Sequence, residues 1–557
     1  MIASLERWIS HPLGSVVICI LAGASLGVAY APYYLWLLAI MAVGIFVVVI
    51  WHSPTRLSRL CRGYLFGVGY FLVTISYLAT VHWLIAIVSI LAMSMWTSLL
   101  AILQGELLRV RCWPIWTAAS WISMEYAMQR FPFGGFAWTR LGYTSVDQPL
   151  GNYLWLISTS GVGFLIAFLG SLGAWIFLRA VPQSALEASR RSPSVSDVKS
   201  FFCSRLAPSR RWRWPALNED ETRNRIKVVI MVTIALFATG TLMAWMPVGE
   251  PPDRITVGIV QGNIDRSHGS HWDGYARSVT NNHLSSTIEL IARAKTGMIS
   301  YPDVIAWPEN AADDDPRTDS VTYSDIDFAA RLGNIPILVG AVMRGPGEGQ
   351  RQTSALWWRP DKQVTARYDK RNAVPFGEYT PMKDMVFALW PQARQVGLQT
   401  VPGDQPGAMK VSYGLFHFIL GPIICYELAF DSTVYDTVNN GAQLLIVQSN
   451  NATYSDTSQP VQQFAITRAR AKELRREIVI ATTNSYSGLI SARGRVRTIS
   501  EPERSAVTTV TLPLRSSISP AARYGRLIEM AIASAGVLPL LHSALSAIRL
   551  RFHGRIL

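Results

Sequence analysis

The chain is poor in cysteine, histidine and charged residues, and each shortage excludes a class of protein. Its five cysteines, at 19, 61, 112, 203 and 425, form no CxxC pair, so neither a disulfide scaffold nor a zinc knuckle is predicted. The nine histidines are scattered without an HExxH motif, and no GxGxxG phosphate loop occurs in the C-terminal half, so no metal and no cofactor are expected. Only 16% of the residues are charged, against about 25% in soluble domains. An ordinary cytosolic enzyme and a disordered chain are both disfavoured.

Long apolar runs take the place of these features. Half of the 557 residues are hydrophobic, and the mean hydropathy is +0.22. A bilayer core about 30 Å thick requires roughly 20 apolar residues per helix. Stretches of this kind lie at 13–31, 33–51, 64–82, 84–107, 113–128, 153–178, 227–246 and 527–548. The sequence therefore predicts a polytopic α-helical membrane protein with about eight transmembrane helices.

The net charge of +14 is concentrated between these stretches. Arginines follow the second and fourth stretches, fill the 179–226 connection and end the chain. The positive-inside rule then places both termini in the cytoplasm and residues 248–526 outside. The 179–226 connection has no extended aromatic pattern, so we interpret it as a juxtamembrane loop and not as a nucleic-acid site. The predicted domains are 1–247, with about seven helices, an extracytoplasmic 248–526, and 527–557, a last helix with a short basic tail.

The first apolar stretch has an alternative interpretation as a cleaved signal peptide, because Ala29, Tyr30 and Ala31 give small residues at a cleavage spacing. A second apolar run begins at once, however, and the alternation of charge requires that the first stretch be retained. We therefore favour a retained helix.

Residues 248–526 have a different pattern, in which short β-branched strands alternate with amphipathic helices. Strands are predicted at 255–260, 303–307, 335–343, 355–358, 364–368, 416–425, 442–448, 478–483 and 506–512, and helices at 275–295 and 459–476. This pattern is typical of an α/β domain with a largely buried sheet.

Three chemically active side chains follow predicted strands of this domain. They are Glu309 in the motif AWPE, Lys370 in YDK, and Cys425 in IICYE. A thiol becomes a good nucleophile as a thiolate, so it requires a base and a cation that stabilises the developing oxyanion. Each residue alone has a simpler explanation, as an inert buried thiol, a helix cap or a solvated lysine. Their occurrence in this order favours a catalytic site.

The order Glu, Lys, Cys in these contexts resembles the nitrilase, or carbon–nitrogen hydrolase, superfamily. The flanking sequence is closer to one branch, the bacterial apolipoprotein N-acyltransferases. The similar segments are VGIVQGNI at 257–264, VPFGEY at 374–379, QLLIVQSN at 443–450, the run 462–473, FGGFAW at 133–138 and RLGY at 140–143.

This resemblance implies an αββα sandwich on an eight-helix membrane base. By motif, Cys425 is the nucleophile, Glu309 the general base and Lys370 the oxyanion stabiliser. The supporting residues are Glu378, Tyr426 and Glu427, and the residues matched to substrate contacts are Trp272, Arg140 and Tyr143. Many family members have Ser-Asn-Asp followed by a Trp-Phe pair where this chain reads SNNATY at 449–454. That difference affects the lipid-facing wall and the acyl-chain preference, and it would fit a Gram-positive or mycobacterial-type variant.

The implied reaction moves a fatty acyl chain from a phospholipid, through a thioester on the cysteine, to the α-amino group of a diacylglyceryl-cysteine lipoprotein. The protein would then lie in the cytoplasmic membrane of a bacterium, with the phospholipid, the lipoprotein and the bilayer as partners; the sequence identifies no accessory protein. The closest alternative is a membrane-tethered amidase or nitrilase that hydrolyses a small amide. A third alternative is a transporter or receptor with an inactive ectodomain, whose helices should carry buried charges along a pathway. Few candidates occur beyond Glu125 and Glu106, and the intact set of Glu, Lys and Cys argues against this alternative. The apolar run 385–390 could contact lipid or pack in a core.

Overall fold

The computed structural model describes residues 11–180, 219–264 and 277–553. Internal contacts divide the chain into two compact units. We call Met1–Phe131, Gly135–Trp245 and Leu527–Leu557 the helical unit, and Pro132–Gly134 with Met246–Arg526 the sandwich unit. Trp272, most of the basic 179–226 connection and the first two residues of the predicted 275–295 helix lie outside the described residues.

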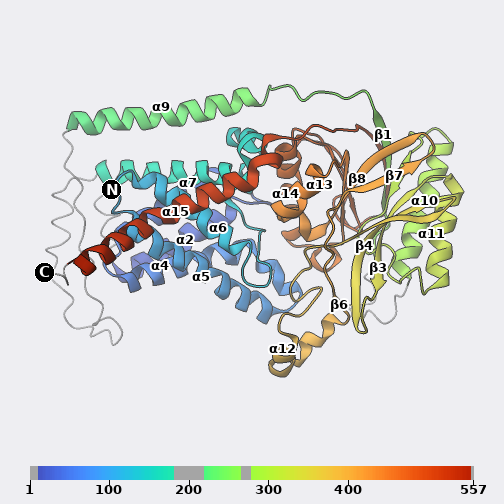
Figure 1. Ribbon diagram of the computed structural model, residues 1–557, viewed down its shortest axis with the longest axis horizontal. Helices are drawn as coiled ribbons and strands as arrows, with labels where there is room; N and C mark the ends of the chain where they lie inside the picture. The colour runs from blue at the N-terminus through green and yellow to red at the C-terminus, as the bar shows by residue number, and fades with distance from the viewer. Residues whose placement is uncertain (1–10, 181–218, 265–276, 554–557) are drawn as a thin grey trace. The chain divides into compact units, whose positions relative to one another are not determined.

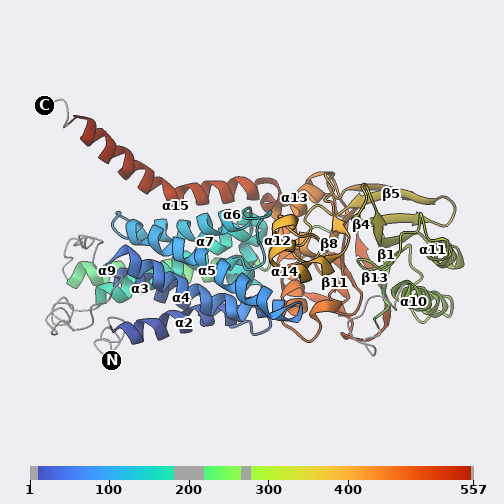
Figure 2. The ribbon, with the colours of Figure 1, turned by 90° about the horizontal axis from the view of Figure 1, so that it is seen from below.

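Each apolar stretch corresponds to one helix. The helices are α2 (Pro12–Val28), α3 (Leu37–Trp51), α4 (Arg56–Thr74), α5 (Trp83–Leu107), α6 (Trp113–Met128), α7 (Leu154–Ala180), α9 (Glu219–Met243) and α15 (Pro520–His553). Figure 2 shows α2 to α7 bundled side by side. Among the described residues four helices are long and apolar enough to cross a membrane, and two more are shorter and apolar. The chain is therefore a membrane protein with several apolar helices, whereas eight crossings and their orientation remain predictions.

Helices α2 and α4 approach each other so closely that glycine is required between them. A Cβ added at Gly23 would lie 1.9 Å from the carbonyl oxygen of Phe66, and one at Gly69 would lie 2.1 Å from that of Ile20. Small residues at such contacts let two membrane helices pack backbone to backbone.

The sandwich unit contains two sheets. The first has the strand order β13-β1-β2-β3-β4-β5, with β6 paired to β4, and the second has the order β12-β11-β10-β9-β8-β7. The strands of the first sheet are β1 (Arg254–Gln261), β2 (Val304–Ala306), β3 (Ile337–Arg344), β4 (Gln350–Arg359), β5 (Gln363–Asp369), β6 (Gln399–Thr400) and β13 (Ala506–Pro513). Those of the second are β7 (Met409–Tyr413), β8 (Phe416–Ile424), β9 (Leu444–Ser449), β10 (Ile478–Thr482), β11 (Gly488–Ile490) and β12 (Val496–Ile499).

Parallel strands form the centre of each sheet, with β1, β2 and β3 in the first and β8, β9 and β10 in the second. One hydrophobic core takes side chains from both sheets, including Val257, Trp357 and Ile446, so the two sheets face each other. A second core lies between the first sheet and the helices α10 (Ser278–Lys295) and α11 (Ser320–Gly333). The helices α13 (Asp431–Asn439) and α14 (Gln459–Leu474) cover the second sheet, which completes an αββα sandwich (Figure 1).

All nine predicted strands and both predicted helices of this unit are present, with ends that differ by a few residues. The sequence predicted no strand at β6, β7, β11 or β12 and no helix at α11 or α13. For α12 (Lys383–Leu389) it left two alternatives open, a lipid contact and a helix packed in the core. The missed strands are short, and β12 carries mostly exposed side chains. Hydrophobic alternation therefore does not distinguish such strands from loops.

Candidate active site

The structure brings the three predicted catalytic residues together at strand ends. Lys370 follows β5 directly, Glu309 follows β2 by three residues, and Cys425 follows β8 directly. Two of these strands belong to the first sheet and one to the second. The site is therefore assembled where the two sheets of the sandwich end.

Lys370 forms the centre of the site. Its Nζ donates to Glu309 Oε1 at 2.8 Å and to Glu378 Oε1 at 2.9 Å. Only 1% of the Lys370 side chain is exposed to solvent, and 4% of that of Glu309. Burial alone would lower the pKa of Lys370, but the carboxylates of Glu309 and Glu378 raise it well above the ordinary lysine value. The lysine is thus a fixed cation.

Cys425 begins a 3₁₀ turn, Cys425–Ala429, and has a left-handed backbone with φ of 51°. That conformation costs a non-glycine residue on the order of 1–3 kcal/mol and is found preferentially at functional sites. The partly buried thiol contacts the core between the sheets. Burial raises the pKa of Cys425, as do the charge of Glu309 and a hydrogen bond with its side chain, while Lys370 opposes the shift. The resting residue is therefore a thiol and not a thiolate.

Glu309 is fixed by contacts to both of its carboxylate oxygens. Oε1 accepts from Lys370, and Oε2 accepts from the backbone N–H of Asn450 at 2.9 Å. The segment that carries Glu309 passes so close to β3 that a Cβ at Gly340 would lie 2.0 Å from the carbonyl oxygen of Pro308. Glycine at this position is therefore needed for the placement of the carboxylate.

Glu378 is the second partner of Lys370, and it also closes its own loop. Its Oε2 accepts from the backbone N–H of Val374 at 2.7 Å, and its Oε1 is 3.4 Å from Thr353 Oγ1. The carboxylate of Glu378 therefore binds the backbone of its own VPFGEY segment with one oxygen and Lys370 with the other. This geometry fits the supporting role that the family resemblance implies.

Glu427 connects the lysine loop to the cysteine turn. Its Oε1 accepts from the Tyr368 hydroxyl at 2.7 Å and from the backbone N–H groups of Arg371 at 2.5 Å and Asn372 at 3.4 Å. Its Oε2 accepts from the backbone N–H of Ile424 at 2.8 Å. The side chain is fully buried, and burial raises the pKa of Glu427. One carboxylate therefore holds the residues that flank both Lys370 and Cys425.

The remaining predicted site residues lie in different surroundings. Tyr426 is buried, and its ring packs edge-on against Phe430 at 5.0 Å between centroids. Arg140 and Tyr143 belong to the helical unit and are both buried. Trp272 lies outside the described residues, so its substrate contact stays a prediction.

Arg140 has polar partners inside the helical unit. Its Nη2 lies 2.6 Å from Ser160 Oγ and 3.6 Å from Glu529 Oε1, and both charged side chains are buried. No motif in the sequence pointed to Glu529. Charge patterning along the chain could not pair two residues that lie on such distant segments.

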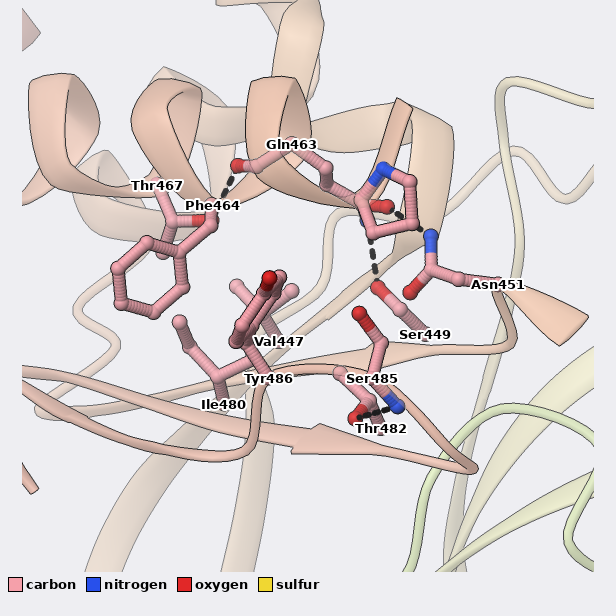
Figure 3. A pocket seen from close by; sticks show the side chains of 11 residues that line it. Val447, Ser449, Asn451, Gln463, Phe464, Thr467, Ile480, Thr482, Ser485 and Tyr486 are labelled. Atoms are coloured by element: carbon pink, nitrogen blue, oxygen red, sulfur yellow. Dashed lines mark hydrogen bonds between the residues drawn. The ribbon is translucent and has the colours of Figure 1, made fainter. Parts of the chain in front are cut away.

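A small cavity lies under the 449–451 segment (Figure 3). It is bounded by α14 and by strands β9 and β10, and Glu309, Lys370 and Cys425 do not line it. Gln463 Nε2 donates to Ser449 Oγ at 2.6 Å, and Asn451 Nδ2 donates to Gln463 Oε1 at 2.5 Å. The cavity thus marks where α14 supports the segment whose sequence departs from the family pattern.

The sequence assigned no role to several groups at this site. They are the backbone N–H of Asn450, the hydroxyl of Tyr368 and the side chain of Tyr454, which interacts electrostatically with Cys425 and Lys370. All three residues fall inside segments that the sequence singles out, Tyr368 in YDK and both Asn450 and Tyr454 in SNNATY. Within the described residues, no group of three or more His, Cys, Asp or Glu side chains is arranged to hold a metal ion.

Comparison with known proteins places the chain in one family. Two family models match it in tandem: the apolipoprotein N-acyltransferase N-terminal domain over residues 22–172, and the carbon-nitrogen hydrolase domain over 256–519. A curated apolipoprotein N-acyltransferase from Mycolicibacterium smegmatis is 27% identical over 93% of this chain and 83% of that protein. One from Vibrio vulnificus is 23% identical over 88% of this chain and 90% of that protein.

Among solved structures, an amidase mutant from Nesterenkonia sp. AN1 with covalent addition at its active-site cysteine matches with 18% identity and a TM-score of 0.35. The match covers 48% of this chain and 93% of the amidase. Both family models and these relatives confirm the family resemblance that the sequence predicted. The chain belongs to the apolipoprotein N-acyltransferase family and carries a carbon–nitrogen hydrolase domain.

Proposed function

We propose that this membrane acyltransferase moves a fatty acyl chain from a phospholipid to the α-amino group of a lipoprotein's N-terminal diacylglyceryl-cysteine, through a thioester on Cys425. The observation that carries the proposal is the buried Lys370, held between Glu309 and Glu378 beside the Cys425 thiol. Relatives that match over most of the chain are named for this activity.

In the first half-reaction Glu309 takes the proton of Cys425, and the thiolate attacks the carbonyl carbon of the phospholipid ester. Because burial raises the pKa of the thiol, proton transfer to the adjacent carboxylate accompanies the attack. The Lys370 ammonium stabilises the oxyanion, since it is desolvated and already in position. The C–O bond then breaks, Glu309 returns the proton to the departing alcohol, and a thioester remains.

In the second half-reaction the amine of the lipoprotein attacks the thioester carbon. Glu309 accepts a proton from the amine, and Lys370 again stabilises the oxyanion. The C–S bond breaks, the thiol of Cys425 is restored, and the product is an amide. Glu378 and Glu427 do not react; they keep Lys370 and the Cys425 turn in place.

The apolar helices explain how the enzyme reaches its lipid substrates. Both substrates carry acyl chains, and each CH₂ removed from a bilayer costs about 0.8 kcal/mol, so the site has to meet them at the membrane. Residues Met382, Met385 and Leu389, on and beside α12, have large exposed fractions, with Leu389 at 79%. These apolar side chains support a contact with lipid and not a core role for the run 385–390.

The competing proposal is a tethered amidase that uses the same residues. Purified protein is given a phospholipid and a diacylated lipopeptide, and the products are identified by mass spectrometry. We expect lysophospholipid and N-acylated lipopeptide in equal amounts. Free fatty acid as the only acyl product, or ammonia released from a small amide with no lipopeptide acylation, would support the hydrolase instead.

Lys370→Arg is expected to lower the rate of thioester formation about tenfold to a hundredfold although it keeps the charge. A guanidinium is planar and larger than an ammonium, so it cannot meet Glu309, Glu378 and an oxyanion in the same buried space. The rate is measured by intact mass after mixing with phospholipid. The control is Arg359→Lys. Arg359 is the last residue of β4 and pairs with Asp361. A near-normal rate in Lys370→Arg would remove Lys370 from the assigned role.

We further propose that both termini are cytoplasmic, that the chain crosses the cytoplasmic membrane of a bacterium several times, and that residues 248–526 are extracytoplasmic. A reporter that works only outside the cytoplasm, such as alkaline phosphatase, is expected to be active when it is inserted near Gly347. Activity there of a reporter that works only in the cytoplasm would overturn this topology.

A further inference from the structure

Helix α14 contacts the segment that binds the general base. The backbone N–H of Asn450 donates to Glu309 Oε2 at 2.9 Å. The residues on either side of Asn450 both bond to the amide of Gln463, on α14 (Figure 3). Gln463 Nε2 donates to Ser449 Oγ at 2.6 Å, and Gln463 Oε1 accepts from Asn451 Nδ2 at 2.5 Å. One buried side chain of α14 therefore fixes the peptide whose N–H group binds Glu309.

The same helix contacts the turn that begins with the nucleophile. Arg470 Nε donates to the carbonyl oxygen of Leu428 at 2.9 Å, and Arg470 Nη2 donates to that of Ala429 at 2.8 Å. These carbonyls belong to the last two residues of the 3₁₀ turn Cys425–Ala429. The Arg470 side chain is completely buried, and its planar guanidinium binds both oxygens in a fixed geometry. The end of the cysteine turn is therefore attached to α14.

Two buried carboxylates orient the guanidinium of Arg470. Its Nη2 pairs with Asp431 Oδ1 at 2.7 Å, and its Nη1 pairs with Glu473 Oε2 at 2.5 Å. The other oxygen of Glu473 accepts from the hydroxyl of Tyr435, on α13, at 2.7 Å. A buried ion network adds little net stability, because each ion loses its hydration. It does restrict the geometry, since few other arrangements of these side chains pair their charges.

Gln463 and Arg470 lie on the same face of α14 (Gln459–Leu474). Seven residues make about two turns of an α-helix, so the two positions are separated by about 10 Å along the helix axis. One end of this face contacts the segment bound to the base, and the other end contacts the turn of the nucleophile. The helix therefore connects the two reacting groups of the protein.

This connection begins where the sheet ends. The hydrogen-bonded register between β8 and β9 stops at the pair Ile424 and Gln448. Cys425 and Asn450 both follow that pair, so the strand ladder does not reach them. Beyond the ladder, α14 bonds to both segments.

We propose that Gln463 and Arg470 are positioning residues through which α14 fixes the distance between Glu309 and Cys425. The inference deepens the proposed function and rests on its assignment of the base and the nucleophile. Neither side chain exchanges a proton. They keep the carboxylate and the thiol aligned, so that the proton can be transferred as the sulfur attacks. A misplacement of about 1 Å between reacting groups costs on the order of 10²-fold in rate.

The test is a double-mutant cycle on the rate of Cys425 acylation, followed by intact mass. The donor is the 4-nitrophenyl ester of a fatty acid, because its good leaving group keeps slow variants measurable. Gln463→Met preserves the length of the side chain and removes its amide hydrogen bonds, so acylation should be about tenfold slower. Arg470→Lys preserves the charge, but one ammonium cannot bind two carbonyls and two carboxylates as the guanidinium does, and acylation should be about a hundredfold slower.

The double variant separates positioning from a general loss of stability. Independent effects at sites this far apart would multiply to about 1,000-fold. If both residues act on one geometry, the second change finds the alignment already lost, and the double variant should be at most about 200-fold slower than the wild type. Shifts in the melting temperature, which report stability, should simply add. The control is Arg468→Lys on the same helix, whose Nε donates to the carbonyl of Gly494; its rate should stay within about twofold of the wild type.

A second cycle covers the case in which Arg470→Lys does not fold. It combines Gln463→Met with Glu309→Gln, where no base remains to be aligned, so Gln463→Met should then slow acylation less than about threefold. Effects that multiply fully in either cycle, or a normal rate in either single variant, would overturn the positioning role. A wild-type protein that is acylated on Cys425 neither by phospholipid nor by the 4-nitrophenyl ester would instead overturn the proposed function.

Discussion

Cys425→Ser is expected to abolish acylation of the protein by phospholipid and to lower turnover by about 10⁴-fold or more. An alcohol ionises far less readily than a thiol, and Glu309, already engaged with Lys370 and Asn450, is too weak a base to deprotonate it. With phospholipid alone the wild type should accumulate the thioester, because a ping-pong intermediate builds up without its second substrate. The intact mass should rise by one acyl group, and neutral hydroxylamine should remove it.

Two controls make this result specific to Cys425. Cys61→Ser changes an exposed cysteine of the helical unit and should acylate as the wild type does. Addition of a diacylated lipopeptide should discharge the wild-type adduct into an amide. An adduct on another cysteine, or full activity of Cys425→Ser, would contradict the nucleophile assignment and the two-step mechanism together.

Glu427→Gln should lower acylation about 10²- to 10³-fold although it leaves the shape of the side chain unchanged. Each oxygen of this buried carboxylate accepts a hydrogen bond from a backbone N–H group, Oε1 from that of Arg371 and Oε2 from that of Ile424. Whichever oxygen becomes an NH₂ then faces an N–H group, and each unsatisfied buried group costs about 1–3 kcal/mol. The loop of Lys370 and the turn of Cys425 would shift apart, and a misplacement of about 1 Å costs on the order of 10²-fold in rate.

The measurement pairs the acylation rate with thermal unfolding of the purified protein. Tyr368→Phe, which removes one donor to Glu427, should have a smaller effect because the backbone donors remain. Glu501→Gln, at an exposed ion pair with Arg504, should change neither quantity. If Glu427→Gln acylated normally, the carboxylate would not be what aligns Lys370 with Cys425.

The extent of the secondary structure was largely predictable from the sequence. Short runs of buried, mainly aliphatic residues such as Leu444–Ser449 in β9 identify central strands, and long apolar runs identify the helices. Short edge elements such as β12 were missed, since exposed side chains carry no alternation. The number of membrane crossings remains a prediction. Length and composition indicate which helices can span a bilayer, but they do not show which helices do.

The sequence by itself determined the candidate residues: a carboxylate, an ammonium and a thiol in characteristic motifs, on a chain with several long apolar stretches. Only the tertiary structure decided which of them are in contact. Glu309 and Lys370 are 61 positions apart, and Glu309 and Asn450 are 141 apart, so no local pattern encodes these contacts. They exist because parallel strands from two packed sheets end at one place, where burial strengthens the interactions between charges and fixes each proton donor beside its acceptor.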